Sequence, residues 1–154
     1  MTEPQASAGQ AEFLAPTPTE AFFNKIMGFF VRIGLGPKGM YLLQVRGRKS
    51  GKIYETPVSL VDVNGRRYLV APRGRTQWVR NAEASGEVSL KRGSKVERFT
   101  LRPIAEPDRP EILKTYLDKY ASVVQRYFTV KAGSPSLAFL PVAARHPVFE
   151  LVAA

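Results

Sequence analysis

Seven consecutive residues in the first half of the chain have the composition of a phosphate-binding turn. Residues 46–52 read Arg-Gly-Arg-Lys-Ser-Gly-Lys and separate two segments with strand-like patterns. The two glycines allow a tight backbone that exposes amide N–H groups, while four cations and one hydroxyl add side-chain donors. Amides and guanidinium groups together bind phosphate oxygens well. The spacing is not that of a Walker A loop, because only three residues separate the glycines and a strand follows. A solvated basic hairpin turn is the alternative interpretation.

Few other residues offer acid, base or metal chemistry. The chain has no cysteine and one histidine, His146, which precedes Pro147 and accompanies no G-x-S-x-G element. The sequence therefore contains no thiolate nucleophile or cysteine metal site and gives no support for a catalytic triad. A zinc site with a single histidine is disfavoured, so no metal is expected and we interpret His146 as a structural or surface residue. Chemistry supplied by a bound cofactor remains open.

The positive charge of the chain is concentrated in its middle. The formal charge is +10, and residues 38–102 hold 15 basic and 5 acidic residues, whereas the rest of the chain holds 8 of each. A field of this kind attracts an anionic partner. Nucleic acid, an anionic membrane surface and a polyanionic small molecule all satisfy it, and charge alone does not choose among them.

Length and composition favour one domain. A chain of 154 residues with a hydrophobic fraction of 44% can build one continuous core. Residues 1–16 are small and polar and are expected to form a disordered arm, followed by a single domain over 17–154. The chain shows neither a secretory signal pattern nor the roughly 18 to 20 apolar residues of a membrane span. A cytoplasmic location is therefore expected.

A helix is predicted for residues 17–35, ahead of the basic turn. Thr17 and Glu20 have capping-box spacing, and Pro18 suits the first helical position. Aromatic and aliphatic residues then recur at helical spacing and form one apolar stripe. This stripe either closes one side of the core or lies against a membrane or an apolar substrate pocket.

Strands dominate the middle of the chain. Alternating apolar residues and the turn signals Asn64-Gly65 and Gly93-Ser94 indicate two hairpins. In the second hairpin, Val96, Phe99 and Leu101 are expected to be buried. The predicted strands are 41–45, 56–63, 67–71, 88–90, 96–101 and 147–152, and the predicted helices are 76–85 and a broken helix over 107–128. The order indicates an α+β fold around a mostly antiparallel barrel.

The basic turn and its neighbours resemble a known family. Residues 42–52, Leu-Leu-Gln-Val-Arg-Gly-Arg-Lys-Ser-Gly-Lys, followed by Thr56-Pro57, are similar to the signature of the deazaflavin-dependent nitroreductase family. The similarity covers about residues 40–105 and includes Trp78-Val79-Arg80-Asn81, where the family carries W-x-x-N. It implies a split β-barrel that binds coenzyme F-420, with FMN as a less favoured cofactor. Because coenzyme F-420 carries a phosphodiester and an oligoglutamate tail, it is a polyanion and fits the charge pattern.

The resemblance also assigns candidate cofactor-binding residues by position. It implies that the phosphate is held by Arg48, Lys49 and Ser50, and that the residues beside the ring are Tyr54, Thr56, Pro57 and Val58. It further implies that the opposite strand end is lined by Val70, Ala71, Pro72 and Arg73, and that the groove is closed by Trp78, Arg80 and Asn81. Two of these residues keep a second interpretation. Trp78 is equally suited to anchor the core, and Asn81 to satisfy a buried backbone group.

The sequence departs from the family pattern at two places. Ile53-Tyr54 stands where many members have Pro-Arg, and Arg75-Thr76-Gln77 replaces the His-Pro or Asn-Pro that often precedes the tryptophan. One cation expected of the family is therefore missing.

The function implied is transfer of a hydride from reduced deazaflavin to a lipophilic electrophile such as a quinone, an activated alkene or a nitroaromatic. No catalytic residue is identified, although Tyr41, Tyr54, Tyr68 or a tyrosine of 116–127 could donate a proton. An FMN-binding reductase and a non-catalytic carrier of a cofactor or lipid are the alternatives. Nucleic acid is not an expected partner, because aromatic residues are sparse in the basic segment. Analogy with other split barrels implies a homodimer, and the apolar helix implies peripheral contact with the inner face of the cell membrane.

Overall fold

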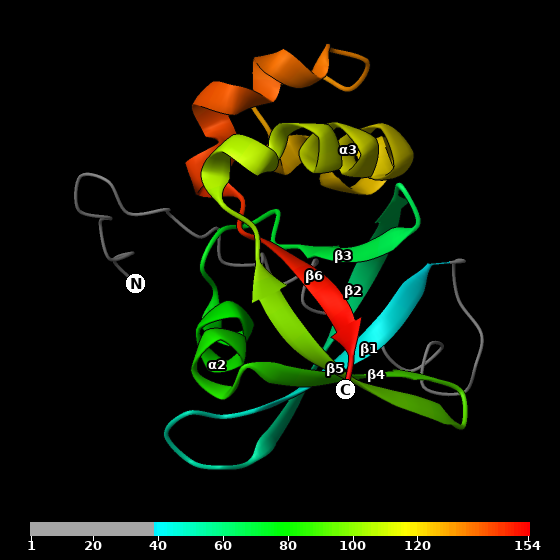
Figure 1. The fold of residues 1–154 in the computed structure, drawn as a ribbon, viewed down its shortest axis with the longest axis vertical. Coiled ribbons are helices and arrows are strands. Elements are labelled where there is room, and N and C mark those ends of the chain that lie inside the picture. Colours follow the sequence, from blue (N-terminus) through cyan, green and yellow to red (C-terminus); the bar gives the residue numbers. More distant parts are fainter. Residues whose placement is uncertain (1–38) are drawn as a thin grey trace.

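Six antiparallel strands close into a barrel in the computed structural model, which describes residues 39–154 (Figure 1). The arm predicted for 1–16 and the helix predicted for 17–35 lie outside these residues. The strand order around the barrel is β1-β2-β3-β6-β5-β4, with β4 pairing back to β1. The elements are β1 Met40–Arg46, β2 Ile53–Val63, β3 Arg66–Val70, α2 Gln77–Ser85, β4 Glu87–Arg92, β5 Lys95–Pro103, η1 Glu106–Asp108, α3 Pro110–Val124, η2 Gln125–Tyr127, η3 Ser136–Arg145 and β6 Val148–Ala153.

The barrel interior is filled by one face of each strand. Side chains alternate across a strand, so in β1 Leu43 and Val45 point inward while Gln44 and Arg46 lie on the outer side. The inward residues form one apolar cluster that reaches from β1 to the plugging helix α2. Its buried members are Leu43, Val45, Val58, Leu60, Leu69, Ala71, Val79, Ala82, Val88, Leu90, Phe99, Leu101, Phe149 and Leu151.

Glycine and asparagine in left-handed conformations fix one of the hairpins. At the β2–β3 connection Asn64 has φ 53° and Gly65 has φ 76°, and the flanking pair is Val63 with Arg66. Positive φ at both central residues matches a type I′ turn, whose twist suits antiparallel strands. The hairpin predicted from Asn64-Gly65 is therefore confirmed.

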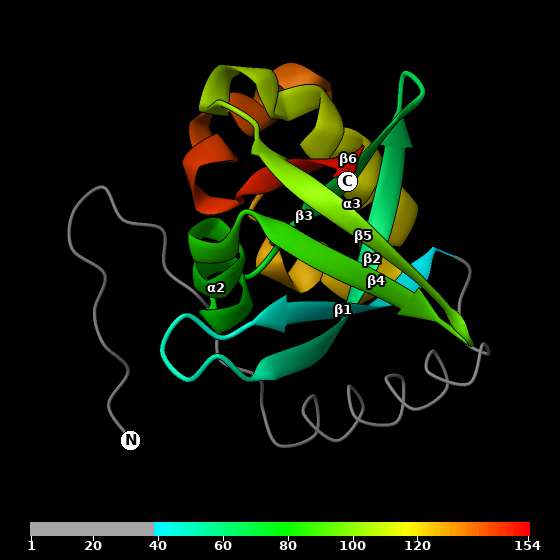
Figure 2. The same cartoon turned by 60° about the horizontal axis from the view of Figure 1, so that its bottom comes forward.

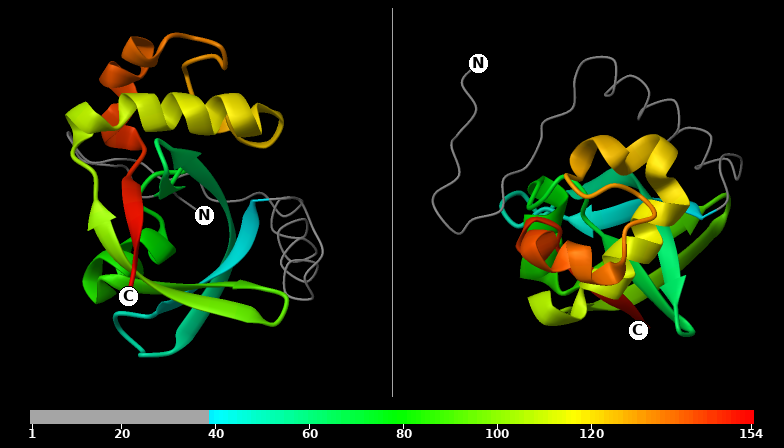
Figure 3. Two further views of the ribbon diagram at one scale, coloured as in Figure 1. Left: turned by 45° about the vertical axis from the view of Figure 1, so that its right-hand side comes forward. Right: turned by 90° about the horizontal axis from the view of Figure 1, so that it is seen from above.

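A helical layer covers part of the outer surface of the barrel. The left view of Figure 3 shows α3 and the following turns stacked on one side of the strands. Beneath this layer lies a second apolar cluster, which joins the outward residues of β2, β3 and β6 to α3 and η3. Its largest fully buried side chain is Phe139 of η3, with Leu113 and Leu117 of α3 beside it in the same cluster. The barrel and the helical layer thus share the wall formed by β2, β3 and β6.

The short helix α2 lies beside the β1–β2 turn (Figure 2). Val79 and Ala82 project from it into the barrel cluster and are fully buried. It ends at Gly86, which has φ 75° and donates its backbone N–H to the Ala82 carbonyl at 2.7 Å. A left-handed glycine at this position satisfies a helix-terminal carbonyl without strain. The packing of α2 therefore places its remaining face against the basic turn.

The predicted fold class is confirmed, with three local differences. β2 begins at Ile53, three residues before the predicted start, because Ile53 to Glu55 pair with Gln44 to Arg46 across the hairpin. The prediction that Val96 is buried was wrong, since its side chain is 50% exposed. Val96 stands an odd number of positions from Phe99 and Leu101 and therefore faces the other side of β5. The sequence interpretation also did not include η3.

His146 has a structural position. It is 3% exposed, stacks on the Phe128 ring at a centroid distance of 4.1 Å, and donates Nδ1–H to the Pro72 carbonyl at 2.9 Å. Burial lowers the pKa of His146 to about 4, which keeps the ring neutral.

Residues 39–154 contain neither a membrane-spanning helix nor a cluster of metal-binding side chains. No helix in this range is long and apolar enough to cross a membrane. No cluster of three or more histidine, aspartate or glutamate residues in the range is arranged to bind a metal ion.

Candidate functional site

The basic turn is held in one shape by its own backbone. The last pair of the β1–β2 ladder is Arg46 with Ile53, and the turn beyond it is closed by the Gly47 N–H, which donates to the Lys52 carbonyl at 2.7 Å. Gly51 has φ 74° and donates its N–H to the Gly47 carbonyl at 3.0 Å. The Arg46 guanidinium donates to the Gly51 carbonyl at 3.0 Å. The charged side chains at the tip therefore project from an ordered frame.

Gly47 lies beneath the ring of Tyr54. A Cβ atom at Gly47 would stand 2.5 Å from Tyr54 Cε2 and 3.0 Å from Ser50 Oγ, which is closer than side chains tolerate. Ser50 and Tyr54 are joined by a hydroxyl–hydroxyl hydrogen bond of 3.2 Å. The missing side chain of Gly47 thus leaves the space in which the Tyr54 ring forms a wall over the turn.

Arg48 is tied to α2 by three hydrogen bonds. Its backbone N–H donates to Asn81 Oδ1 at 3.1 Å, and its guanidinium donates to the same oxygen at 2.7 Å. A third bond runs from the guanidinium to Gln77 Oε1 at 3.1 Å. Asn81 is only 5% exposed, whereas Arg48 itself is exposed. The turn and the helix are therefore linked directly, although they are separated by about thirty residues of sequence.

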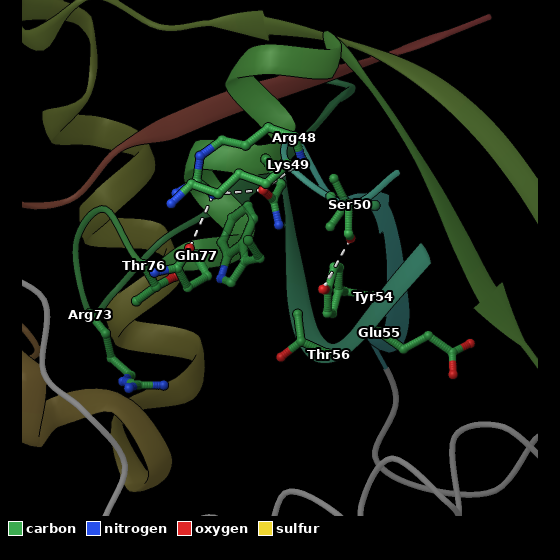
Figure 4. A pocket seen from close by; sticks show the side chains of 13 residues that line it. Arg48, Lys49, Ser50, Tyr54, Glu55, Thr56, Arg73, Thr76 and Gln77 are labelled. Atoms are coloured by element: carbon green, nitrogen blue, oxygen red, sulfur yellow. Dashed lines mark hydrogen bonds between the residues drawn. The ribbon is translucent and has the colours of Figure 1, made fainter. Parts of the chain in front are cut away.

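A pocket of about 530 Å³ lies between the turn and α2. Figure 4 shows Ser50, Tyr54 and Thr56 on one wall and Arg73, Thr76 and Gln77 on the other. This volume is that of a pocket for a cofactor-sized ligand. The residues that line it are Val45, Gly47, Arg48, Lys49, Ser50, Tyr54, Glu55, Thr56, Arg73, Thr76, Gln77, Trp78 and Asn81.

The pocket is positively charged. Of the residues that the structure describes, three cations, Arg48, Lys49 and Arg73, and one carboxylate, Glu55, line it. Glu55 accepts a hydrogen bond from Gln44 Nε2 at 2.8 Å, on the side of the strand away from Arg48 (Figure 4). Several cations around one concave site raise the local concentration of an anionic ligand.

A second cavity of about 150 Å³ adjoins the first. Both are lined by Thr56, Arg73, Thr76 and Trp78, so the two cavities meet along these four residues. Beyond this junction the second cavity is bounded by the predicted residues Pro57, Val58, Val70, Ala71 and Pro72, and by residues of the helical layer that include Tyr116, Val123, Val124 and Tyr127. Among the described residues, this wall holds no charged side chain beyond Arg73 at the junction, whereas Arg48 and Lys49 line the first cavity.

The structure places thirteen of the fourteen predicted site residues along the two cavities. Eight line the first cavity, and Pro57, Val58, Val70, Ala71 and Pro72 line the second. Arg80 is exposed and lines neither of them. In α2 the residues Gln77, Trp78 and Asn81 share one face, and Arg80 falls outside it because successive helical residues are rotated by about 100°.

Trp78 and Asn81 each combine the two interpretations that the sequence left open. Trp78 lines both cavities and also packs on Phe149 in the barrel core, with ring centroids 6.4 Å apart. Asn81 lines the first cavity and also accepts a hydrogen bond from a backbone N–H, that of Arg48. Neither residue has to be assigned to packing or to the site alone.

Sequence reasoning missed Thr76 and Gln77 as site residues. It treated both as departures from a family pattern, yet both line the first cavity. The Thr76 hydroxyl is buried and has no hydrogen-bond partner within the described part of the chain. The predicted helix began at Thr76, and the structure makes Thr76 the N-cap of a helix that starts at Gln77. Threonine is a preferred N-cap residue, which was the available signal for its position at this helix end.

The candidate tyrosines differ in whether they line a cavity, which the sequence could not show. Tyr54 lines the first cavity, and Tyr116 and Tyr127 line the second, whereas Tyr41 and Tyr68 line neither. Burial raises the pKa of Tyr116 above its ordinary value.

A closed antiparallel barrel with a basic, cofactor-sized pocket at the end plugged by a helix defines the split-barrel class of flavin- and deazaflavin-binding proteins. Solved structures agree with this fold. A domain-swapped dimer shares 25% identity over 86% of this chain and 92% of its own, with a TM-score of 0.55. A NimC/NimA family protein from Clostridium acetobutylicum shares 12% identity over 84% of this chain and 81% of its own, with a TM-score of 0.51.

A protein of unknown function from Agrobacterium tumefaciens also matches. It shares 15% identity over 75% of this chain, with a TM-score of 0.55, and the present chain spans 48% of its length. A comparison with curated proteins gave no match.

The family is shown by a sequence model. The model for F420H(2)-dependent quinone reductase matches residues 22–133, which is more than half of the chain. The chain therefore belongs to the F420H(2)-dependent quinone reductase family. Accordingly it is an oxidoreductase, and its cofactor is coenzyme F-420.

Proposed function

We propose that the pocket between the basic turn and α2 binds coenzyme F-420 and that Arg48, Lys49 and Ser50 hold its phosphate. The observation that carries this proposal is the concentration of three cationic side chains, Arg48, Lys49 and Arg73, around one pocket. Gly47 supports it, because the missing side chain lets Tyr54 and Ser50 close over the turn. The donor set is that expected for a phosphate: two cations and a hydroxyl from one ordered turn.

The remaining lining residues suit the less charged part of the cofactor. We assign Thr56, Trp78 and the strand ends at Val58 and Val70 to the sides of its ring, because they lie at and beyond the junction of the two cavities. When bound, the reduced deazaflavin supplies a hydride. The protein's own residues orient the reactants, exclude water and hold protons.

A lipophilic electrophile is the proposed substrate, with a quinone ahead of an activated alkene or a nitroaromatic. Support comes from the uncharged side chains of Val123, Val124 and Tyr127, which line the second cavity. Tyr127 is the tyrosine that we assign as proton donor, because it lines this cavity and is only partly buried. Tyr116 is less suited to give up a proton, since burial raises its pKa.

Titration of the purified protein tests the proposed site. We expect micromolar or tighter binding of coenzyme F-420, followed by cofactor fluorescence, and weaker binding of FMN. Replacing Arg48→Ala and Lys49→Ala together removes two charge-assisted contacts of about 1.5 kcal/mol or more each, so affinity should fall on the order of a hundredfold.

The control removes two cations elsewhere. Arg66→Ala with Arg67→Ala makes the same charge change at the distant β2–β3 hairpin, where both arginines approach carboxylates. If both double variants lose affinity equally, the effect is one of net charge and the assigned phosphate site is wrong. Tighter binding of FMN than of coenzyme F-420 would favour the alternative of an FMN-binding reductase. Deazaflavin binding without reduction of any quinone, alkene or nitroarene would favour the carrier.

We further propose that the protein forms a homodimer and contacts a membrane peripherally. The similar solved structure that is a domain-swapped dimer supports the first part. The expected lipophilic substrate supports the second. Sedimentation at micromolar concentration measures the first, with a monomer as the contradicting result, and co-sedimentation with anionic liposomes measures the second, where a fully unbound protein contradicts it.

A further inference from the structure

The hydrogen-bond acceptors of Arg48 are all uncharged. Within residues 39–154 its guanidinium donates to Asn81 Oδ1 at 2.7 Å and to Gln77 Oε1 at 3.1 Å, and its backbone N–H donates to Asn81 at 3.1 Å. Both acceptors are side-chain amides, which orient a guanidinium through hydrogen bonds but bring no negative charge to it.

Five other arginines among residues 39–154 lie close to carboxylates. Arg75, Arg98 and Arg102 donate to carboxylates at the ion-pair distance, and Arg66 and Arg67 stand within 4 Å of one. Their partners are Glu83, Glu87, Glu150, Glu150 and Asp62 respectively. Acidic residues thus lie beside these five arginines, and Arg46 and Arg109 donate to backbone carbonyls. Arg48, which lines the pocket, is held by side-chain amides.

Among residues 39–154, Glu55 is the one carboxylate that lines the pocket, and it forms no ion pair with Arg48. Glu55 belongs to β2 and accepts a hydrogen bond from Gln44 Nε2 of β1 at 2.8 Å. Figure 4 shows its side chain directed away from Arg48 and Lys49. Within the described part of the chain, the charge of Arg48 is therefore held in place with no carboxylate in contact.

We propose that Asn81 and Gln77 are positioning residues that hold the Arg48 guanidinium toward the pocket while leaving its charge available to an anionic ligand. This inference rests on the proposed function of the pocket. An aspartate at position 81 could accept the same two hydrogen bonds, but its carboxylate would neutralise the Arg48 guanidinium in an internal ion pair. A neutral amide orients the guanidinium without neutralising its charge. The buried position of Asn81 keeps its Oδ1 atom in place.

The substitution Asn81→Asp separates these two roles. It keeps the Oδ1 acceptor and the shape of the side chain, so the folded protein is expected to unfold at the same temperature as wild type or higher. Affinity for coenzyme F-420 should fall about tenfold to a hundredfold, because a charge-assisted contact to the ligand is replaced by an internal one. The dependence of Kd on salt concentration should also become weaker, since the pocket carries one positive charge less.

Three further variants serve as controls for the Asn81→Asp measurement. Asn64→Asp adds the same negative charge at the distant β2–β3 turn and should change Kd by less than about twofold, because salt screens charges beyond about 10 Å. Gln77→Glu should act in the same direction as Asn81→Asp but more weakly, since Gln77 is exposed. Arg48→Ala tests the proposed function itself and should weaken binding strongly.

The outcomes are distinguishable. If Arg48→Ala leaves Kd unchanged, the proposed phosphate site is wrong. If Arg48→Ala weakens binding while Asn81→Asp folds normally and binds coenzyme F-420 with wild-type Kd and salt dependence, Asn81 has only a structural role and this inference is overturned. Equal losses from Asn81→Asp and Asn64→Asp would also contradict it, because the effect would then be one of overall charge.

Discussion

Gly47 shapes the candidate site because it has no side chain, which leaves room for Tyr54 and Ser50. The residue is buried although it belongs to an exposed turn, and the ring of Tyr54 occupies the space that a methyl group would need. The atoms nearest to a Cβ added at Gly47 belong to the side chains of Tyr54 and Ser50, and Tyr54 is 49% exposed. The turn can therefore tolerate a larger residue only by moving Tyr54 out of the pocket wall.

Gly47→Ala should consequently affect binding more than stability. Because Tyr54 can swing into solvent, we expect the free energy of unfolding to change by less than about 1 kcal/mol, while coenzyme F-420 binds roughly fivefold more weakly from a displaced, off-rotamer ring. Cofactor fluorescence and thermal unfolding measure the two effects. In a Tyr54→Ala background the same substitution should have little further effect on Kd, and a full additional loss there would show that Tyr54 does not transmit it.

The residue types at the turn could be predicted from sequence, but their partners could not. The pattern of glycines and cations over 46–52 indicated anion binding without any knowledge of the fold. Gln77 and Asn81 could not be assigned as the acceptors of Arg48, because those contacts join residues 29 and 33 positions apart. Hydrogen bonds across such separations are decided by the packing of whole elements.

At the scale of elements, the site is a junction between a hairpin and a helix that pack on the same barrel end. Residues of α2 fill the barrel with one face, Val79 and Ala82, and present another, Gln77 and Asn81, to the turn. The helical spacing of these residues therefore determines both the plug and the pocket. The same helical spacing explains Arg80, which was predicted as a site residue but lies on the exposed side of the helix.

The elements themselves were predictable where local signals agreed. Asn64-Gly65 and Gly93 mark tight turns, and each lies between two strands that the alternation of apolar residues indicated. The signal failed for Val96, because a β-branched residue favours strands on either face and does not report which face is buried. It also failed for η3, whose Pro141 argues against helix and whose Phe139 and Val142 are buried by contacts with the helical layer.

At the scale of the whole molecule, His146 joins the helical layer to the cavities. Its ring stacks on Phe128 of that layer, and its Nδ1–H bonds the carbonyl of Pro72, which lines the second cavity. Burial is the largest cause of its lowered pKa, and the nearby positive charges of Arg145 and Arg109 lower it further. The folded protein therefore contains this histidine in its neutral form.

The stability of the protein should accordingly depend on pH below neutrality. The folded pKa of about 4 lies below the ordinary value of 6.5, so between these values the unfolded chain binds the proton and the folded chain does not. The stabilisation is complete above about pH 6.5 and is lost progressively as the pH falls toward 4, by roughly 3 kcal/mol in total at 1.36 kcal/mol per pKa unit. Denaturant unfolding at a series of pH values measures this loss.

His146→Asn is the matched variant, because its amide can still donate to the Pro72 carbonyl but does not titrate. The dependence of unfolding free energy on pH between 6.5 and 4 should flatten in this variant. Asp118 does not obscure the comparison. Its pKa is lowered by the hydrogen bond from Lys114 and then by the Gly133 N–H, so its contribution is present above about 3.8 and is lost at lower pH. An unchanged slope in His146→Asn would show that other groups control the acid loss.

The most direct test of the central claim, that coenzyme F-420 lies between the basic turn and α2, is a map of backbone amide chemical shifts. The uniformly labelled 154-residue chain would be titrated with coenzyme F-420, and the shifts followed residue by residue. We predict the largest changes at residues 46–52 and 76–81, with smaller changes along 56–58 and 70–73 at the junction of the cavities. Saturable binding whose largest changes fall on the β4–β5 hairpin or the η3 surface, with residues 46–52 unchanged, would contradict the account.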